Sequence, residues 1–239
     1  MEIWGHRGAY HYAPENTIYS FEKAIELGAD GIEFDVQLTK DGEVVVIHDE
    51  KIDRVSNGTG LVKDYTLSEL KKINFNKRGI SEPYFMEIPT LEEVLQLLAT
   101  TGLSINIELK TGIVYYDGLE RKTVDIVNKY GLSERVLYSS FNHYSIQKVK
   151  EYDPTAKTAL LCGGGIIVTG EQCEKVGAAA LHPSVQQMRY PGLIEDSHKH
   201  GVKVHVWTVE DEDDFAYAKE HGVDAVFVND ITKFKGYAK

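Results

Sequence analysis

The sequence predicts an α/β fold with the architecture of a (β/α)8 TIM barrel. Short runs rich in Ile, Val and Leu alternate with segments of helical periodicity along most of the chain, a pattern typical of parallel strands joined by helices. Eight strand–helix units can be counted, and the chain length of 239 residues suits one closed barrel. The alternative is an open doubly wound sheet, but no Gly-x-Gly-x-x-Gly turn follows the first strand. We therefore predict a single barrel domain over residues 1–239.

A strand, a helix and a hairpin open the chain. Residues 2–6 predict the strand, and the helix begins at residues 14–17 and ends at Gly28, since Pro and Thr favour helix starts and Gly favours helix ends. A second strand begins at Gly31. It leads to Asp41-Gly42, a strong hairpin signal.

The return strand of this hairpin is predicted over residues 44–48. If the turn contains two residues, Asp35 lies opposite His48, and cross-strand partners are about 4.5–5.5 Å apart at Cβ. A longer turn shifts this pairing by one or two residues.

The pattern loosens over residues 50–89, where turn residues at 57–60 and one short helix over 66–73 are the main signals. Such a long irregular segment does not suit a plain loop in a compact domain. We predict a small inserted subdomain or lid after the hairpin.

From residue 90 the alternation is regular. Pro89-Thr90 predicts the start of an amphipathic helix that continues to residue 98,. The remaining strands are predicted over 104–109, 136–140, 158–161, 179–181, 203–207 and 225–228, and the remaining helices over 119–130, 144–152, 169–176, 190–200 and 210–221.

The composition excludes some functions. The net charge is −11, from 26 basic and 37 acidic residues, which opposes nucleic acid binding. An anionic substrate would need a local cation to reverse the sign of the field. The N-terminus lacks a basic segment followed by an apolar run, and no apolar run approaches the length of a membrane span. We expect a cytoplasmic protein without stable membrane insertion.

Chemically active side chains gather at the predicted carboxyl ends of the strands, where such barrels carry their active sites. Acids two residues apart on a strand are usually only a solvated face, and a His after an apolar run is often a strand-end residue. The convergence of many such groups at one rim is more specific. The first strand ends at His6-Arg7, the second carries Glu33 and Asp35, the third carries Glu108 and Lys110, and later strands end near His182, Trp207 and Asn229-Asp230.

Three clustered carboxylates need a counter-charge. Within about 4 Å they repel one another by about 4 kcal/mol per pair at an effective dielectric near 20, so either one is protonated or a cation lies among them. Oxygen ligands suit Mg²⁺ or Ca²⁺ better than zinc. With Arg7, Lys110 and such an ion, the site would be locally positive and would hold a phosphate, and two histidines would supply an acid and a base.

The motifs at these positions resemble those of the glycerophosphodiester phosphodiesterases. The resemblance implies a TIM barrel with a small insertion after the hairpin, hydrolysis of glycerophosphodiesters to an alcohol and sn-glycerol 3-phosphate, and a divalent metal. The chain departs from the family pattern after its last strand, where Asn229-Asp230 replaces the usual Thr-Asp with a nearby Pro. The matching segments run in order almost from end to end: His6-Arg7-Gly8, residues 14–17, residues 32–36, residues 39–42, His48-Asp49, residues 88–91, residues 106–110 and residues 206–208.

The resemblance also implies roles for single residues. Glu33, Asp35 and Glu108 match the ligands of the divalent cation, Ca²⁺ or Mg²⁺. His6 and His48 match the general acid/base pair, and Arg7 matches the arginine that contacts the phosphate. Lys110 is expected to face the phosphate as well, and Trp207 matches an aromatic residue of the pocket wall. Independently of the resemblance, His182 and His205 either line the barrel mouth or pack inside the barrel, and packing is the expectation. The expected partner is a small-molecule glycerophosphodiester, and the sequence leaves a homodimer open.

Three questions stay open at this point. A metal-dependent sugar isomerase on the same barrel, or a barrel that only binds phosphate or lipid, would share some of these residues. The nucleophile is either the glycerol 2-hydroxyl, which would give a cyclic phosphate as in the related phosphatidylinositol-specific phospholipases C, or water. The sequence does not assign the acid and the base between the two histidines.

Overall fold

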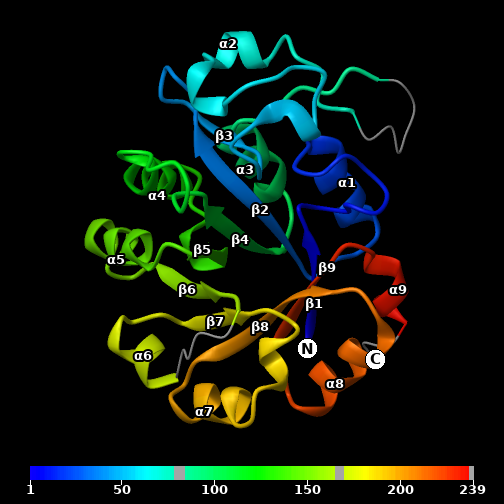
Figure 1. Cartoon of the computed structure of the whole chain (residues 1–239), viewed down its shortest axis with the longest axis vertical. Coiled ribbons are helices and arrows are strands. Elements are labelled where there is room, and N and C mark those ends of the chain that lie inside the picture. Colours follow the sequence, from blue (N-terminus) through cyan, green and yellow to red (C-terminus); the bar gives the residue numbers. More distant parts are fainter. Residues whose placement is uncertain (78–83, 165–169, 237–239) are drawn as a thin grey trace.

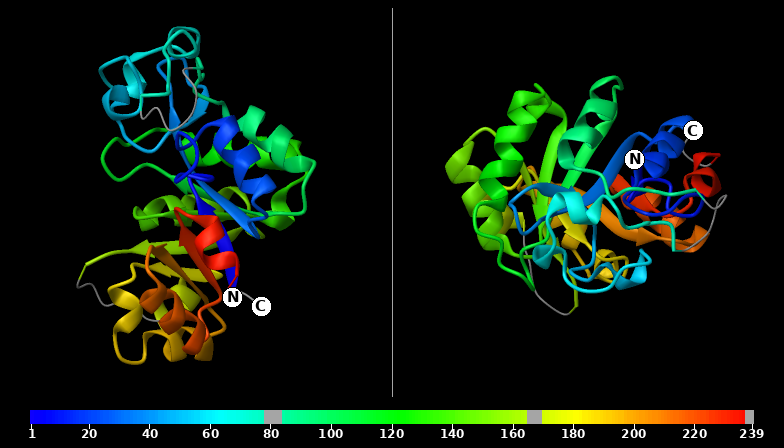
Figure 2. Two further views of the ribbon diagram at one scale, coloured as in Figure 1. Left: turned by 90° about the vertical axis from the view of Figure 1, so that its right-hand side faces the viewer. Right: turned by 90° about the horizontal axis from the view of Figure 1, so that it is seen from above.

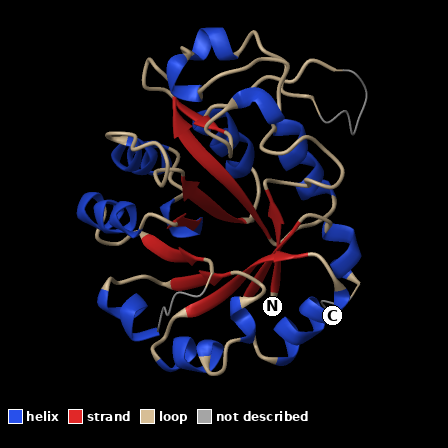
Figure 3. Ribbon diagram, in the orientation of Figure 1, coloured by secondary structure: helices blue, strands red, loops and turns tan. Residues whose placement is uncertain are grey.

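The computed structural model describes residues 1–77, 84–164 and 170–236. Within these residues, eight parallel strands form a barrel and most helices lie outside it (Figure 1; Figure 3). Neighbouring strands follow the order β1-β9-β8-β7-β6-β5-β4-β2, and pairing of β1 with β2 closes the ring. The predicted (β/α)8 fold is therefore confirmed. The barrel strands are β1 (Glu2–His6), β2 (Gly31–Leu38), β4 (Ser104–Leu109), β5 (Val136–Ser140), β6 (Lys157–Cys162), β7 (Ala180–Pro183), β8 (Lys203–Val209) and β9 (Ala225–Val228).

The helices lie close to their predicted positions, with one addition. The predicted helix over 190–200 begins only at Leu193, after Gly192 in the left-handed conformation, and the predicted start at residue 169 lies outside the described residues. A terminal helix that we did not predict is capped by the Asp230 carboxylate, which accepts from the N–H groups of Thr232 and Lys233. The helices are α1 (Ile18–Glu26), α2 (Leu67–Leu70), α3 (Leu91–Ala99), α4 (Leu119–Lys129), α5 (His143–Tyr152), α6 (Gly170–Lys175), α7 (Leu193–Lys199), α8 (Glu212–Glu220) and α9 (Ile231–Lys235).

Two apolar layers support the barrel. The main core includes strand residues such as Phe34 and Val206 and helix residues such as Phe21, Leu95 and Phe234. A smaller cluster on the barrel strands contains Trp4, Leu137, Ala159, Ala180, Ala225 and Phe227. Every residue of β2 is buried, because a barrel strand has one face inside and the other against the helices. Among the described residues, no helix is both long and apolar enough to cross a bilayer.

The predicted hairpin exists, and its turn is longer than two residues, so the pairing of the two strands is shifted by one residue from that of a two-residue turn. Strand β3 (Val44–Val46) pairs with β2 so that Val36 lies opposite Val46, and Asp35 therefore faces Ile47 rather than His48. Thr39 pairs with Glu43, so the turn contains three residues, 40–42. The last of them, Gly42, has a φ of 81°. A residue in this left-handed conformation is typical of three-residue hairpin turns.

The segment after the hairpin has an apolar cluster of its own. Val45 of β3 and Ile47, which follows the strand, pack with Ile52, Leu70 and Phe75 of this segment. It contains two short 3₁₀ turns, η1 (Ile52–Arg54) and η2 (Val62–Asp64), and helix α2. Figure 2 shows the segment in cyan, beside β2 and away from the yellow and orange half of the barrel. Two further 3₁₀ turns, η3 (Ser133–Arg135) and η4 (Gln187–Arg189), belong to the barrel loops.

Candidate active site

A cavity of about 140 Å³ opens at the carboxyl ends of the barrel strands. One part of its wall is formed by charged and imidazole side chains, and the other part by aromatic and aliphatic ones. The lining residues are His6, Arg7, Glu33, His48, Asn106, Glu108, Phe141, Leu161, His182, Trp207, Thr208 and Phe227.

Three carboxylates meet at this cavity because of strand pairing. Glu33 and Asp35 lie two residues apart on β2, and Asp35 is the parallel neighbour of Glu108 on β4. One oxygen from each lies within 4.8 Å of the others. Oδ1 of Asp35 is buried and has no hydrogen-bond partner among the described residues. Since Mg²⁺ and Ca²⁺ bind oxygens at about 2.0–2.6 Å, this spacing fits one hard divalent ion.

The electrostatics of the trio also favour a bound cation. Burial, followed by repulsion from Asp35 and Glu108, raises the pKa of Glu33 well above its ordinary value. Burial and Asp35 likewise raise the pKa of Glu108. For Asp35, burial is outweighed by His48, Arg7 and Lys110, so its pKa is lowered. The raised pKa values of Glu33 and Glu108 show that added positive charge, from a proton or a cation, is favoured at the trio.

The orientation of His6 is fixed from one side. Its Nδ1 lies 2.8 Å from Oδ1 of Asn229, and Nδ2 of Asn229 donates to Glu210 at 2.7 Å. Because the Glu210 carboxylate can only accept, the amide oxygen of Asn229 faces His6, and Nδ1 of His6 carries a hydrogen. Burial and the nearby Arg7 lower the pKa of His6 to about 4. His6 is thus a neutral imidazole whose Nε2 has a free lone pair, 4.0 Å from Glu33.

The side chain of His48 lies between a carboxylate and an ammonium group. Its Nδ1 donates to Asp49 at 2.6 Å, and its Nε2 lies 3.2 Å from Nζ of Lys110. Lys110 also donates to Glu108 at 2.8 Å and lies 3.9 Å from Asp35. The lysine predicted to face the phosphate therefore joins two of the carboxylates to this histidine.

His48 reaches the cavity although it lies beyond the end of β3. Nε2 of Gln37 contacts the carbonyl oxygens of Ile47, His48 and Asp49 at 3.2, 2.9 and 2.8 Å. Oε1 of Gln37 in turn accepts from Tyr116 at 2.8 Å. Gln37 is fully buried, so one carboxamide holds the backbone that carries His48.

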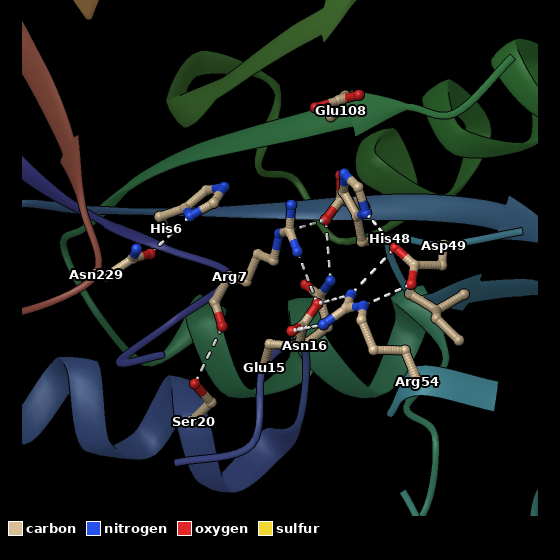
Figure 4. Close-up of polar contacts among 12 residues, drawn as sticks. His6, Arg7, Glu15, Asn16, Ser20, His48, Asp49, Arg54, Glu108 and Asn229 are labelled. Carbon is tan, nitrogen blue, oxygen red and sulfur yellow. Dashed lines mark hydrogen bonds and ion pairs between the residues drawn. The ribbon is translucent and has the colours of Figure 1, made fainter. Parts of the chain in front are cut away.

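Arg7 contacts the trio through both its backbone and its side chain. Its N–H donates to Glu33 at 2.9 Å, with a φ of 55° that costs a non-glycine residue about 1–2 kcal/mol. Its guanidinium donates to Glu15 at 2.8 Å and lies 3.6 Å from Asp35. Figure 4 shows this arginine between His6 and Glu15.

The aromatic side of the cavity is built around Trp207. Its ring meets Phe141 edge to face, with centroids 5.5 Å apart, and its Nε1 donates to the carbonyl of His182 at 2.8 Å. His182 is fully buried and lines the cavity, and its Nε2 lies 3.0 Å from Nδ1 of His205. His182 therefore packs against His205 and also lines the cavity, so both of the possibilities left open for this residue apply.

Comparison with known proteins shows the family of this chain. Residues 6–233 match the model of the glycerophosphoryl diester phosphodiesterase family. The chain belongs to this family. A glycerophosphodiester phosphodiesterase of Caldanaerobacter subterraneus subsp. tengcongensis is 45% identical over 232 residues, which cover 95% of this chain and 93% of that protein. One from Bacillus altitudinis is 37% identical, with 95% and 94% covered. The enzyme class predicted from the sequence, a glycerophosphodiester phosphodiesterase, is thereby confirmed.

Solved structures of glycerophosphodiester phosphodiesterases show the same fold. The enzyme from Agrobacterium tumefaciens superposes with a TM-score of 0.84 at 30% identity and covers 98% of both chains. A phosphodiesterase from Oleispira antarctica, solved in complex with the product sn-glycerol-3-phosphate, has a TM-score of 0.85 at 29% identity and covers 99% of this chain and 96% of that chain.

The structure brings together all of the predicted site residues of this glycerophosphodiester phosphodiesterase. Asp35 and Lys110 contact the groups that line the cavity, and the other six line it directly. Several supporting residues had no predicted role: Glu15, Gln37, Asp49, Arg54, Asn229 and Asn16, which donates to Asp35 at 2.9 Å. Asn229 stood out only as a departure from the family pattern, and it contacts His6.

Proposed function

We propose that this enzyme hydrolyses glycerophosphodiesters to an alcohol and sn-glycerol 3-phosphate with the help of a divalent cation, Mg²⁺ or Ca²⁺, held by Glu33, Asp35 and Glu108. The observation that carries the proposal is the trio of carboxylates, in which one buried oxygen of Asp35 has no hydrogen-bond partner among the described residues. The product complex of the Oleispira antarctica relative supports the choice of product. When bound, such an ion would supply the positive charge that an anionic phosphate needs in this acidic protein.

The two histidines have environments that suit opposite roles. His6 is neutral and offers Nε2, so it accepts the proton of the nucleophile. His48 is held by Asp49, which accepts its Nδ1–H, and by Lys110, whose Nζ lies 3.2 Å from its Nε2, and we assign to it the proton transfer to the leaving oxygen. The nucleophile is either the glycerol 2-hydroxyl or water, and accumulation of a cyclic phosphate in ³¹P NMR spectra distinguishes the two.

The remaining residues hold the substrate. Arg7 and Lys110 place two positive charges beside the site of the phosphate, where they stabilise the charge that develops on its oxygens. Trp207 and Phe141 offer an apolar wall to the carbon chain of the substrate.

A panel of glycerophosphodiesters, assayed for release of sn-glycerol 3-phosphate, tests the proposal. We expect release that EDTA abolishes and that Mg²⁺ or Ca²⁺ restores. Interconversion of aldoses and ketoses without release of sn-glycerol 3-phosphate would instead indicate the isomerase, and tight binding without turnover would indicate a binding protein. Either result would refute the proposal.

A further inference from the structure

One guanidinium lies directly behind two of the residues that surround the cavity. Arg54, at the end of η1 in the segment after the hairpin, donates to Glu15 through Nη1 at 2.5 Å and Nη2 at 2.7 Å. It also donates to Asp49 through Nε at 2.6 Å and Nη2 at 3.1 Å. Figure 4 shows Arg54 between the two carboxylates. Paired bonds to two carboxylates fix a planar guanidinium in position and in angle.

Each of these carboxylates also holds a residue of the site. Glu15 accepts from Arg7 at 2.8 Å, and Asp49 accepts from Nδ1 of His48 at 2.6 Å. Arg54 therefore contacts neither the cavity nor the carboxylate trio, yet it is one residue removed from both the histidine and the arginine.

Charge balance explains why a second cation is needed. The Glu15 side chain is only 3% exposed, and a buried carboxylate with Arg7 as its one partner would neutralise that arginine. With the guanidinium of Arg54 added, the net charge of Glu15, Arg7 and Arg54 is +1. Arg54 then neutralises Glu15, and the charge of Arg7 remains available for an anion. The pKa of Glu15 is lowered by Arg54 and Arg7 although burial opposes this, so the carboxylate stays ionised.

The same cation orders the second carboxylate. The Asp49 side chain is 28% exposed and the Arg54 side chain 37%, so an unrestrained Asp49 would be free to turn towards solvent. Two bonds from Arg54 hold it in the orientation that receives the His48 ring.

We propose that Arg54 is a positioning residue of the hydrolase, which orients His48 through Asp49 and leaves the charge of Arg7 free through Glu15. The inference rests on the proposed function. Through Arg54, the segment after the hairpin would hold residues of the active site in position. Misplacement of such groups costs about 10- to 100-fold in activity.

The test is a double-mutant cycle of Arg54→Lys and Asp49→Ala, measured as steady-state release of sn-glycerol 3-phosphate. Lysine keeps the charge but cannot donate two hydrogen bonds to each carboxylate at once. We therefore expect kcat to fall about 10-fold and KM to rise. In the Asp49→Ala background, Arg54→Lys should no longer lower kcat and should still raise KM through Glu15. Arg121→Lys changes an exposed arginine that lies 3.7 Å from Asp125 and serves as the control without effect.

Two results would overturn the inference. Arg54 would be only a structural link if Arg54→Lys lowers the midpoint of urea unfolding but leaves kcat and KM as in the wild type. Effects on kcat that multiply in the double variant would likewise show that Arg54 does not act through Asp49. A wild-type enzyme without any release of sn-glycerol 3-phosphate would instead refute the proposed function itself, so the two failures are distinguishable.

Discussion

Glu33→Gln should stabilise the metal-free protein while it removes a ligand of the cation. The oxygens of the trio lie within 4.8 Å of one another, a distance at which two charges repel by about 3 kcal/mol at an effective dielectric of 20. Glutamine keeps the shape of Glu33 and an oxygen that can accept from the Arg7 N–H. It gives up the attraction to the Arg7 charge, which offsets part of the gain.

The size of the gain has an upper limit. Because the pKa of Glu33 is raised, the wild-type carboxyl escapes repulsion by binding a proton on folding. From an ordinary value of 4.5 to pH 7, this proton uptake costs at most about 3 kcal/mol. We therefore expect the free energy of unfolding in EDTA at pH 7 to rise by about 2 kcal/mol in the variant.

Urea unfolding in EDTA, repeated with excess Mg²⁺ or Ca²⁺, measures this effect. The wild type should gain stability from the ion and Glu33→Gln should not. Glu15→Gln is a matched control that should lower the free energy of unfolding. It removes the buried negative charge that pairs with Arg7 and Arg54, which should cost about 3–5 kcal/mol. If Glu33→Gln is destabilised in EDTA as Glu15→Gln is, the carboxylates do not repel one another and the case for a cation fails.

Three further predictions concern the histidines. His48→Ala should lower kcat about 10²–10⁴-fold with an unchanged circular dichroism spectrum, and a near-normal rate would exclude a role in proton transfer. Gln37→Met leaves the carbonyl groups around His48 without a donor, so kcat should fall about 10- to 100-fold while unfolding remains cooperative; equal kinetics would show that His48 needs no such support. Burial lowers the pKa of His205 to about 4, so between about pH 6.5 and pH 4 the unfolded chain binds a proton that the folded chain does not. This group should therefore cost about 2 kcal/mol of stability between pH 7 and pH 5, and His205→Gln should reduce that loss; an equal loss in the variant would contradict the assignment.

Much of the fold follows from local patterns that the sequence displays directly. Strand runs such as 104–109 and helix ends such as Gly131 depend on periodicity and on single residues of special conformation. The parallel order then aligns the carboxyl ends of the strands, which is why Asp35 and Glu108 could be expected to meet.

The hairpin register could not be predicted in the same way, because it depends on the length of one turn. Thr39 sets that length through bonds of its hydroxyl group to Asp41 and to the Glu43 N–H. A single residue more in the turn moves every pairing by one. His48 still reaches the site because Gln37 holds its backbone. No sequence pattern predicts this contact between a buried carboxamide and the carbonyl oxygens of a neighbouring segment.

The polar contacts that support the site could not be predicted either, because they join residues that are far apart in the sequence. Glu15 and Arg54 are 39 residues apart, and His6 and Asn229 are 223 apart. Such pairs depend on how separate elements are placed in space. Family motifs marked the positions of Glu15 and Asp49 without indicating that one arginine joins them.

The central claim is that the carboxylate trio binds the cation that holds a phosphate. Calorimetry tests it most directly, by comparing the binding of sn-glycerol 3-phosphate to protein in EDTA with its binding to protein supplied with Mg²⁺ or Ca²⁺. We predict heat of binding only when the divalent ion is present, and none in either condition for Glu33→Gln. Equal affinity in EDTA and in the presence of the ion would contradict the account.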